Sequence, residues 1–439
     1  MDKKKRSFFA DSSSVFGNNI LILIIGIATS ILLARYLGPE GRGIYAAILV
    51  YPILLTSLAE LGIRQSIIFL VGQKQYPPEK IIPVLLWMII VSSMLSILIV
   101  GGIFFFLKDP DFSLFAIILA LFYIPFRIVI SYSQGVFVGK GEIWRFNQLN
   151  WIPQVILFLG IIILVVLGNF YVIGALVATL IGSLIMSVYA LFLLSQISPL
   201  KVLFDLEIVK RLIGLGVLYG IALFIINLNY RIDIVIMQQL TTVAEIGLYT
   251  VGVSVAELVL QIPRAVGIVV FSRSANSQEP DLFSKRLTKL FRVSFISAMV
   301  CGIILALIAP YLVPFVFGTA FLPSVLVIQL IMPGIIMRTA FAVLNFDMAG
   351  KGKPVISLVA LLPALIINVI LNIILIPSYG ANGAAFASSI SYVFGSVFFI
   401  CLYSKVTRIN LRDIFRFQTS DFDFIPMIIQ KIKVRIKGI

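Results

Sequence analysis

The sequence alternates long apolar stretches with short polar or charged breaks over nearly its whole length. A helix needs about 20 predominantly apolar residues to cross the hydrocarbon core of a bilayer. Stretches of this kind lie at 14–37, 44–71, 81–107, 112–138, 147–168, 171–196, 210–239, 245–271, 287–309, 320–349, 354–377 and 381–404. The pattern predicts an all-α, polytopic membrane protein with twelve transmembrane helices.

Composition strengthens this prediction and narrows the function. The chain is 60% hydrophobic and 12% charged, with a mean hydropathy of +1.11, so it has too little polar surface to cover a soluble domain. It contains no histidine, which removes the usual general base and the commonest metal ligand. We therefore expect no enzyme activity, no metal and no cofactor other than a coupling H⁺ or Na⁺.

The net charge of +15 follows the predicted topology. With the N-terminus in the cytoplasm, 26 of the 34 lysines and arginines fall in cytoplasmic segments, and the opposite side carries Arg35, Arg42 and Lys108. This is the asymmetry of the positive-inside rule, so binding to nucleic acid is not needed to explain the basic charge. We expect a multi-pass protein of the cytoplasmic membrane with both termini in the cytoplasm.

The two halves of the chain repeat one another. A shift of 211 residues places Arg127 on Arg338 and the GKG at 139–141 on the GKG at 350–352. Two further matches keep the same order, at shifts of 204 and 209: 43–45 with 247–249, and 174–181 with 383–390. Since each repeat holds six spans, both enter the membrane from the same side, as in parallel-repeat transporters.

The repeat divides the chain into two six-helix bundles with a short connection between them. The predicted parts are an N-terminal bundle (1–196), a cytoplasmic linker (197–209), a C-terminal bundle (210–404) and a basic cytoplasmic tail (405–439). The tail is expected to lie as a flexible arm on the anionic inner leaflet. Each GKG marks a tight turn after the fourth span of its repeat, with Lys140 or Lys351 near the lipid headgroups; a phosphate-binding loop would need more of that motif.

Several segments resemble the polysaccharide transporter family, whose members flip lipid-linked oligosaccharides and belong to the multidrug/oligosaccharidyl-lipid/polysaccharide exporter superfamily. The most specific is LARYLGPEGRG at 33–43, and others are QGVFVGKGE at 134–142, DMAGKGKP at 347–354 and GANGAAFA at 380–387. The resemblance implies a two-lobed bundle of the multidrug-exporter (MATE) type that works by alternating access. It also implies an undecaprenyl-type pyrophosphate oligosaccharide as substrate and cell-surface polysaccharide biosynthesis as the process. Membrane lipids and other polysaccharide-assembly proteins are the further partners that we expect.

Five arginines lie within predicted spans, where an unpaired arginine costs roughly 2.5 to 3.5 kcal/mol on insertion scales. They are Arg64, Arg127, Arg231, Arg264 and Arg338, and the carboxylates well inside spans are Glu60, Asp233, Glu257 and Asp347. We assign all five arginines to a cationic substrate cavity. Each must find a partner or face water.

Some of these charges have partners within their own span. Glu60 precedes Arg64 by four residues, the favourable order for an ion pair within a helix, and we expect that pair to form. Glu257, Gln261 and Arg264 lie on one helix face over two turns, so the glutamine can connect the two charges. Arg231 and Asp233 diverge around span 7, which therefore either lines a wet cavity or is locally unwound.

Arg127 and Arg338 have the fewest partners nearby, and the repeat relates them. We hypothesise that both bind the pyrophosphate, because a guanidinium matches phosphate oxygens in a bidentate geometry. The alternative is structural pairing with Asp233 or Glu257. The acidic residues Glu60, Asp233 and Glu257 are expected to pair with arginines or, for Asp233 and Glu257, to carry a coupling ion.

Three other functions compete with a flippase. A multidrug or metabolite exporter of the same superfamily would favour an anionic or apolar cavity, whereas the spans here carry five arginines and four acids. A membrane glycan polymerase or glycosyltransferase usually needs a large extramembrane loop or an acidic catalytic cluster, and the sequence shows neither. A channel is the least favoured, because no span has a re-entrant filter pattern.

Overall fold

The structure is a computed structural model that describes residues 8–261, 263, 267, 270, 274, 280–351, 353, 355–416 and 421. Within these residues the secondary structure is helical, and no strand is present. This is the outcome expected of a chain whose backbone must satisfy its own hydrogen bonds in lipid. The predicted all-α class is confirmed.

The helices lie over the predicted apolar stretches, although their limits differ at several places. In the first part of the chain they are α1 (Phe8–Ala59), α2 (Ile63–Gly72), α3 (Pro78–Leu107), α4 (Leu114–Gly139), α5 (Ile143–Ile161), the π-helix η1 (Ile162–Leu167), α6 (Tyr171–Ser195), α7 (Leu206–Asn229) and α8 (Ile232–Leu240). In the second part they are α9 (Val243–Ala256), the 3₁₀ turn η2 (Glu257–Leu260), α11 (Pro280–Phe317), η3 (Thr319–Phe321), α12 (Ser324–Gly350), α13 (Val355–Thr407) and α14 (Leu411–Phe415).

Two helices are about twice as long as one membrane crossing requires. α1 has 52 residues and α13 has 53, but each contains one glycine with non-helical backbone angles, Gly38 at φ 66° and Gly380 at φ 51°. A left-handed backbone favours glycine, which lacks a Cβ. These glycines lie between the predicted spans 1 and 2 and between spans 11 and 12, so the sequence placed both breaks correctly.

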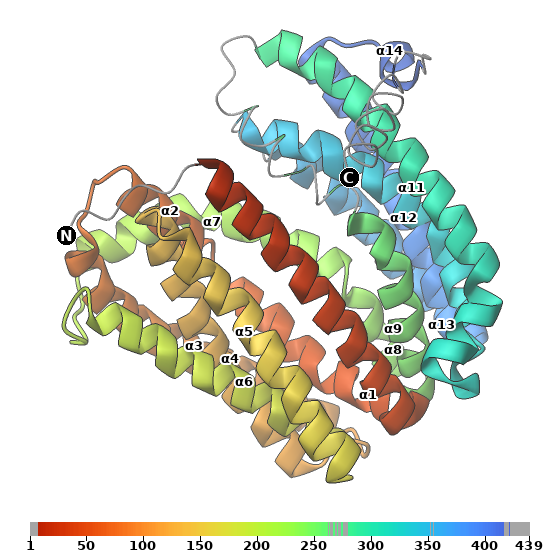
Figure 1. Cartoon of the computed structure of the whole chain (residues 1–439), viewed down its shortest axis with the longest axis horizontal. Helices are drawn as coiled ribbons and strands as arrows, with labels where there is room; N and C mark the ends of the chain where they lie inside the picture. Colours follow the sequence, from red (N-terminus) through yellow and green to blue (C-terminus); the bar gives the residue numbers. More distant parts are fainter. Residues whose placement is uncertain are drawn as a thin grey trace, which may run out of the picture. The chain divides into compact units, whose positions relative to one another are not determined.

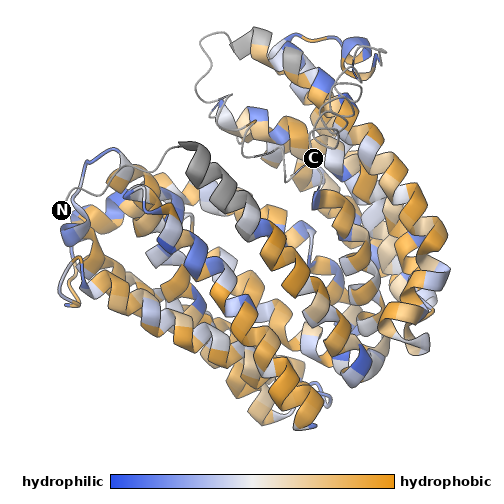
Figure 2. Cartoon of the chain, viewed as in Figure 1, coloured by the Kyte–Doolittle hydropathy of each residue, from blue (hydrophilic) through white to orange (hydrophobic). Residues whose placement is uncertain are grey.

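The described residues contain nine helices that are long and apolar enough to cross a membrane, or ten if the two segments of α7 that meet at 46° form one span. Figure 2 shows apolar residues along the helix bodies and hydrophilic residues more often near helix ends and connections. The predicted count of twelve stays a prediction.

One compact unit comprises the residues up to Val251 together with Tyr311–Ser324 and Ile373–Ala381. Within it α4 packs against α2 and α6, and α5 packs against α1 and α6 (Figure 1). The predicted second span is broken at residues 60–62 and the seventh at residues 230–231, so each forms two helices. Of the two alternatives for span 7, a wet cavity or local unwinding, the structure shows local unwinding at residues 230–231.

A reciprocal contact between glycines joins α1 to α9 inside this unit. A Cβ added to Gly43 would lie 1.7 Å from the carbonyl oxygen of Val243, and one added to Gly247 would lie 1.9 Å from that of Pro39. The shift of 204 residues found in the sequence relates Gly43 to Gly247 and also Pro39 to Val243. A reciprocal contact of this kind is what a two-fold relation between the repeats predicts.

The second unit comprises Gly252–Pro310, Val325–Asn372 and the residues from Asn382 onward. Here α12 and α13 approach closely, since a Cβ at Gly334 would lie 2.6 Å from Cα of Ser389. The ring centroids of Phe341 and Phe399 are 4.6 Å apart between the same two helices. The predicted domain boundaries at 196, 209 and 404 stay predictions.

The beginning of the predicted flexible tail is docked within this second unit. Ile414 of α14 is fully buried, and the ring of Phe415 lies 5.5 Å from that of Phe291 on α11. Arg292 donates two hydrogen bonds to Asp421, at 2.7 and 2.8 Å, and both side chains are buried. For these residues the expectation of a free arm is wrong, because aromatic packing and a bidentate ion pair hold them. The basic residues 431–437 lie outside the described residues.

The glycine contact predicts a sharp difference between two small substitutions. Gly43→Ala should lower the apparent unfolding midpoint in detergent by several degrees, because the added methyl meets a backbone carbonyl that cannot move aside as a side chain can. Gly102→Ala in α3 is the matched control, since a Cβ there has nothing within 4 Å and alanine favours the helix. Equal midpoints for the two variants would show that the close crossing is absent.

Candidate functional site

Arg127 lies on α4, two residues after Pro125, and its side chain is half-buried. Its guanidinium carbon is 5.9 Å from the ring centroid of Tyr123, one helical turn away. Among the described residues no carboxylate forms an ion pair with Arg127. A cation–π contact compensates only part of the cost of a desolvated guanidinium. Arg127 is therefore a cation within an apolar span that can still accept an anionic partner.

The predicted Glu60–Arg64 ion pair is wrong for this structure. Leu61 and Gly62 have left-handed backbone angles, with φ of 40° and 67°, so Glu60 and Arg64 do not lie on one continuous helix. The i, i+4 geometry exists only within one continuous helix. No ion pair joins Glu60 to Arg64 across the described ranges. Arg64 is the second residue of α2, and its Cγ would lie 3.3 Å from a Cβ at Gly135 of α4.

The α7–α8 break places polar groups within an apolar stretch. Arg231 is the residue before α8, and Asp233 in the first turn is fully buried and accepts a 2.6 Å hydrogen bond from the Tyr249 hydroxyl. Asn229, 1% exposed, has no hydrogen-bond partner for either amide atom within the part of the chain that the structure describes. A buried amide without hydrogen-bond partners is costly. The break therefore holds polar groups whose hydrogen-bonding capacity is only partly used.

Arg338 on α12 forms an ion pair with Glu257, at 2.9 Å between Nη1 and Oε1. The arginine side chain is 11% exposed and the glutamate side chain 34%. The guanidinium carbon also lies 5.3 Å from the ring centroid of Tyr392. The structural pairing that was the alternative for Arg338 is thus present, with Glu257 as its partner. Arg264, the partner expected for Glu257, lies outside the described residues.

Sequence reasoning missed an extensive buried network among the described residues, which surrounds Asp347 at the end of α12. Asp347 is fully buried and accepts hydrogen bonds from Ser274, Ser284 at 2.7 Å and the Tyr403 hydroxyl at 2.8 Å. Lys351 lies 3.4 Å away as an i, i+4 ion-pair partner. The acid-first spacing of Asp347 and Lys351 was the signal in the sequence that could have indicated it.

The two GKG lysines therefore differ in environment although the repeat relates them. Lys140 pairs with Glu142 at 3.3 Å, and both side chains are 26% exposed. Lys351 is 12% exposed and also donates a hydrogen bond to Ser284. The expectation that both lysines face the lipid headgroups is wrong for Lys351, because a buried carboxylate binds it inside the second unit.

These observations define an all-helical, multi-pass membrane protein that holds charged side chains inside its helical units. Solved structures share the fold. The lipid II flippase MurJ in an inward closed conformation has a TM-score of 0.76 and 16% identity, covering 98% of this chain and 97% of that one. An inward-facing multidrug resistance MATE family transporter of the MOP superfamily has a TM-score of 0.71 and 14% identity, covering 88% and 94%.

A family profile described as "Polysaccharide biosynthesis protein" matches residues 8–278, which is more than half of the chain. The chain belongs to this family, and the resemblance inferred from LARYLGPEGRG and the related segments is confirmed. An uncharacterized membrane protein of Methanocaldococcus jannaschii is 25% identical over 393 residues, which is 84% of this chain and 91% of that protein.

The Asp347 network predicts unequal effects for the repeat-related lysines. Lys351→Met should reduce the free energy of unfolding by about 2 kcal/mol or more, because it leaves a buried carboxylate without its cation. Lys140→Met removes a more exposed ion pair and should change the free energy of unfolding by less than about 1 kcal/mol. Thermal unfolding of both variants in one detergent, followed by tryptophan fluorescence, measures the difference. Equal midpoints would contradict the structural role of the Lys351 pair.

Proposed function

We propose that this chain is a flippase for an isoprenoid (undecaprenyl-type) pyrophosphate-linked oligosaccharide. It moves this lipid across the cytoplasmic membrane for cell-surface polysaccharide biosynthesis. Membership of the polysaccharide biosynthesis family supports the process, and the fold shared with a lipid II flippase supports the reaction. The glycan headgroup passes through a cationic cavity by alternating access while the isoprenoid tail stays in the bilayer.

Arg127 is the single observation that carries the substrate class. A half-buried guanidinium at membrane depth, with an aromatic ring beside it and no carboxylate ion pair among the described residues, is suited to an anionic group that arrives and leaves. Phosphate oxygens match the guanidinium fork, and the low dielectric of the surroundings strengthens the contact. Arg64 and Arg231 add positive charge on α2 and at the α7–α8 break.

Arg338 contributes through exchange of partners. Its guanidinium is balanced by Glu257, so a pyrophosphate that binds Arg338 must compete with this carboxylate. A displaced Glu257 loses the cation that favours its charged form, and taking up a proton or a sodium ion would compensate. Glu257 thereby links substrate binding to an ion gradient. Asp233 is the second candidate, since it is fully buried with Tyr249 as a hydrogen-bond donor.

Transport in proteoliposomes tests the arginines directly. With a labelled isoprenoid pyrophosphate oligosaccharide, Arg127→Ala should reduce the initial translocation rate at least tenfold, and Arg127→Lys should recover part of it, because the charge remains but the fork is lost. Arg412→Ala on α14 removes an exposed cation and should leave the rate unchanged. Full transport by Arg127→Ala and Arg338→Ala at normal protein level would reject the phosphate-binding role.

Ion coupling has its own measurement. Glu257→Gln should abolish stimulation of transport by an imposed proton or sodium gradient while leaving gradient-independent exchange measurable, because the amide cannot take up the ion. Asp233→Asn is compared in the same assay. Unchanged gradient dependence in both variants would remove these two carboxylates from the coupling step.

An exporter of cationic compounds is the second candidate, favoured by the fold likeness to the MATE family transporter. The same proteoliposomes distinguish it. Extrusion of a cationic dye without any movement of the lipid-linked glycan would assign the chain to that function instead.

A further inference from the structure

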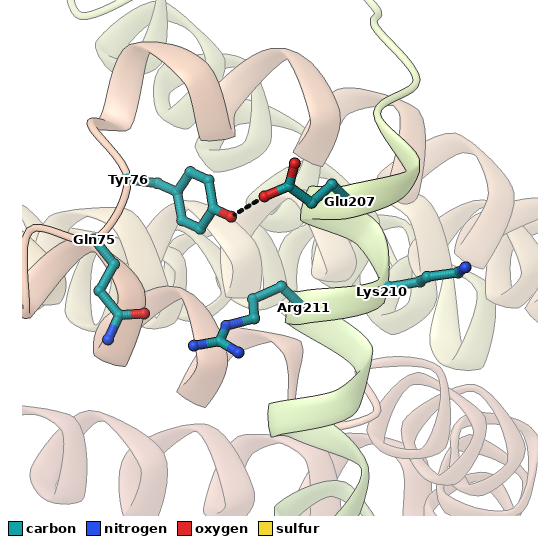
Figure 3. A pocket seen from close by; sticks show the side chains of 5 residues that line it. All are labelled: Gln75, Tyr76, Glu207, Lys210 and Arg211. Atoms are coloured by element: carbon teal, nitrogen blue, oxygen red, sulfur yellow. Dashed lines mark hydrogen bonds between the residues drawn. The ribbon is translucent and has the colours of Figure 1, made fainter.

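A hollow of about 480 Å³ lies beside the start of α7, at the predicted cytoplasmic end of the first unit. Gln75 and Tyr76 line it from the loop between α2 and α3, and Glu207, Lys210 and Arg211 line it from the first turns of α7 (Figure 3). It is separate from the arginines of the spans, and the flippase proposal makes no use of it. Two cations and one carboxylate give its lining a net positive charge.

The carboxylate that lines this hollow, Glu207, is hydrogen-bonded to a neutral side chain, the Tyr76 hydroxyl. Glu207 precedes Arg211 by four residues, the favourable order for a helical ion pair, yet Glu207 accepts a 2.8 Å hydrogen bond from the Tyr76 hydroxyl. The Tyr76 hydroxyl is protonated at physiological pH, as is usual for tyrosine, and this bond raises its pKa further. No ion pair of the described chain includes Arg211 or Lys210. The guanidinium is therefore available to an external anion.

The side chains that could donate to such an anion come from two segments. In Figure 3 the guanidinium of Arg211 and the amide of Gln75 lie on the same side of the hollow, while Lys210 extends away from them. A guanidinium presents a planar fork, and an amide adds a neutral donor. This combination suits phosphate oxygens, with Lys210 supplying longer-range attraction.

The segment that leads into α7 indicates that this hollow lies at the membrane interface. Its large apolar side chains are exposed, although the segment is held in place: Leu203 donates a 3.1 Å hydrogen bond to the Pro83 carbonyl, and the ring of Phe204 lies 4.7 Å from Trp87. The exposed residues are Leu200, Val202, Leu203, Phe204 and Leu206. An ordered apolar segment beside basic residues is typical of the membrane interface, with the apolar groups toward the acyl chains and the cations at the phosphates.

We propose that this hollow binds the phosphate of an anionic membrane phospholipid, with Arg211 as the principal ligand, Gln75 as a second donor and Leu203 and Phe204 against the acyl chains. The predicted cytoplasmic side carries the anionic lipids that a basic site of this kind attracts. Bound lipid would fix the linker between the two repeats against the α2–α3 loop.

Native mass spectrometry of the full chain tests the site with two lipids of equal acyl chains, phosphatidylglycerol and phosphatidylcholine. Phosphatidylglycerol should bind preferentially, and Arg211→Gln should weaken it about fivefold or more. Arg412→Gln, which removes an exposed cation from α14, is the charge-matched control and should have little effect. An equal loss in both variants, or equal binding of both lipids, would overturn the proposal.

Tyr76 provides a test that leaves the basic residues in place. Tyr76→Phe frees Glu207 to pair with Arg211, so phosphatidylglycerol binding should fall severalfold. Adding Glu207→Gln to this variant removes the competing carboxylate and should restore binding. Weak binding that persists in the double variant would show that Tyr76 acts on folding or packing rather than through Glu207, and would count against the site.

A competition experiment distinguishes a phospholipid from other molecules that carry a phosphate. Neither inorganic phosphate nor undecaprenyl phosphate, each at a concentration equal to the phospholipid, should displace phosphatidylglycerol efficiently. Displacement by inorganic phosphate would assign the hollow to a soluble anion. Displacement by undecaprenyl phosphate, with preferential binding of that lipid, would make it a docking site for cargo. Either result would overturn the phospholipid assignment.

Discussion

The lack of water in the bilayer core is the constraint on which this structure depends. Every charge inside a span must find a protein partner, reach a wet space or pay a cost of several kcal/mol. Arg338 meets this constraint by forming an ion pair with Glu257. Asp347 is bound by Lys351 and by three hydroxyl groups. Asp233 accepts a hydrogen bond from a tyrosine hydroxyl. Arg64, Arg127 and Arg231 form no carboxylate ion pair among the described residues. Of these three, Arg127 lies within one continuous apolar helix with an aromatic ring beside it, whereas the other two lie at helix breaks.

The same constraint explains where the helices break. Backbone groups released by a break need new partners, so breaks are expected beside polar side chains or close backbone contacts. The interruption at 60–62 lies against α7, where a Cβ at Gly62 would be 2.1 Å from the carbonyl oxygen of Gly216. The α7–α8 interruption lies among Asn229, Arg231 and Asp233. Both broken spans thus carry charged residues where the backbone groups lose their helical hydrogen bonds.

Much of the fold was predictable because hydropathy and glycine positions act locally. The positions of the apolar helices and the breaks at Gly38 and Gly380 follow from short segments of sequence, and unwinding near Arg231 was one of the two alternatives that its polar residues predicted. The partner of each charge was harder to predict, since Glu257 meets Arg338 across 81 positions and Asp421 meets Arg292 across 129. The expected Glu60–Arg64 pair failed because two residues with left-handed backbone angles ended the helix, and a spacing rule contains no information about such a break.

The repeat clarifies how two similar halves can have different tasks. The pair Gly43 and Gly247 keeps its symmetry, because a backbone crossing tolerates almost no variation in side-chain size. The charged pairs have diverged: Arg127 lies beside Tyr123 whereas Arg338 is bound to Glu257, and Lys140 is partly exposed whereas Lys351 serves a buried carboxylate. Packing positions are constrained by their repeat partner, whereas charged positions are constrained only by local surroundings. A duplicated unit can therefore keep its close backbone crossing while the surroundings of its charged residues diverge between the two copies.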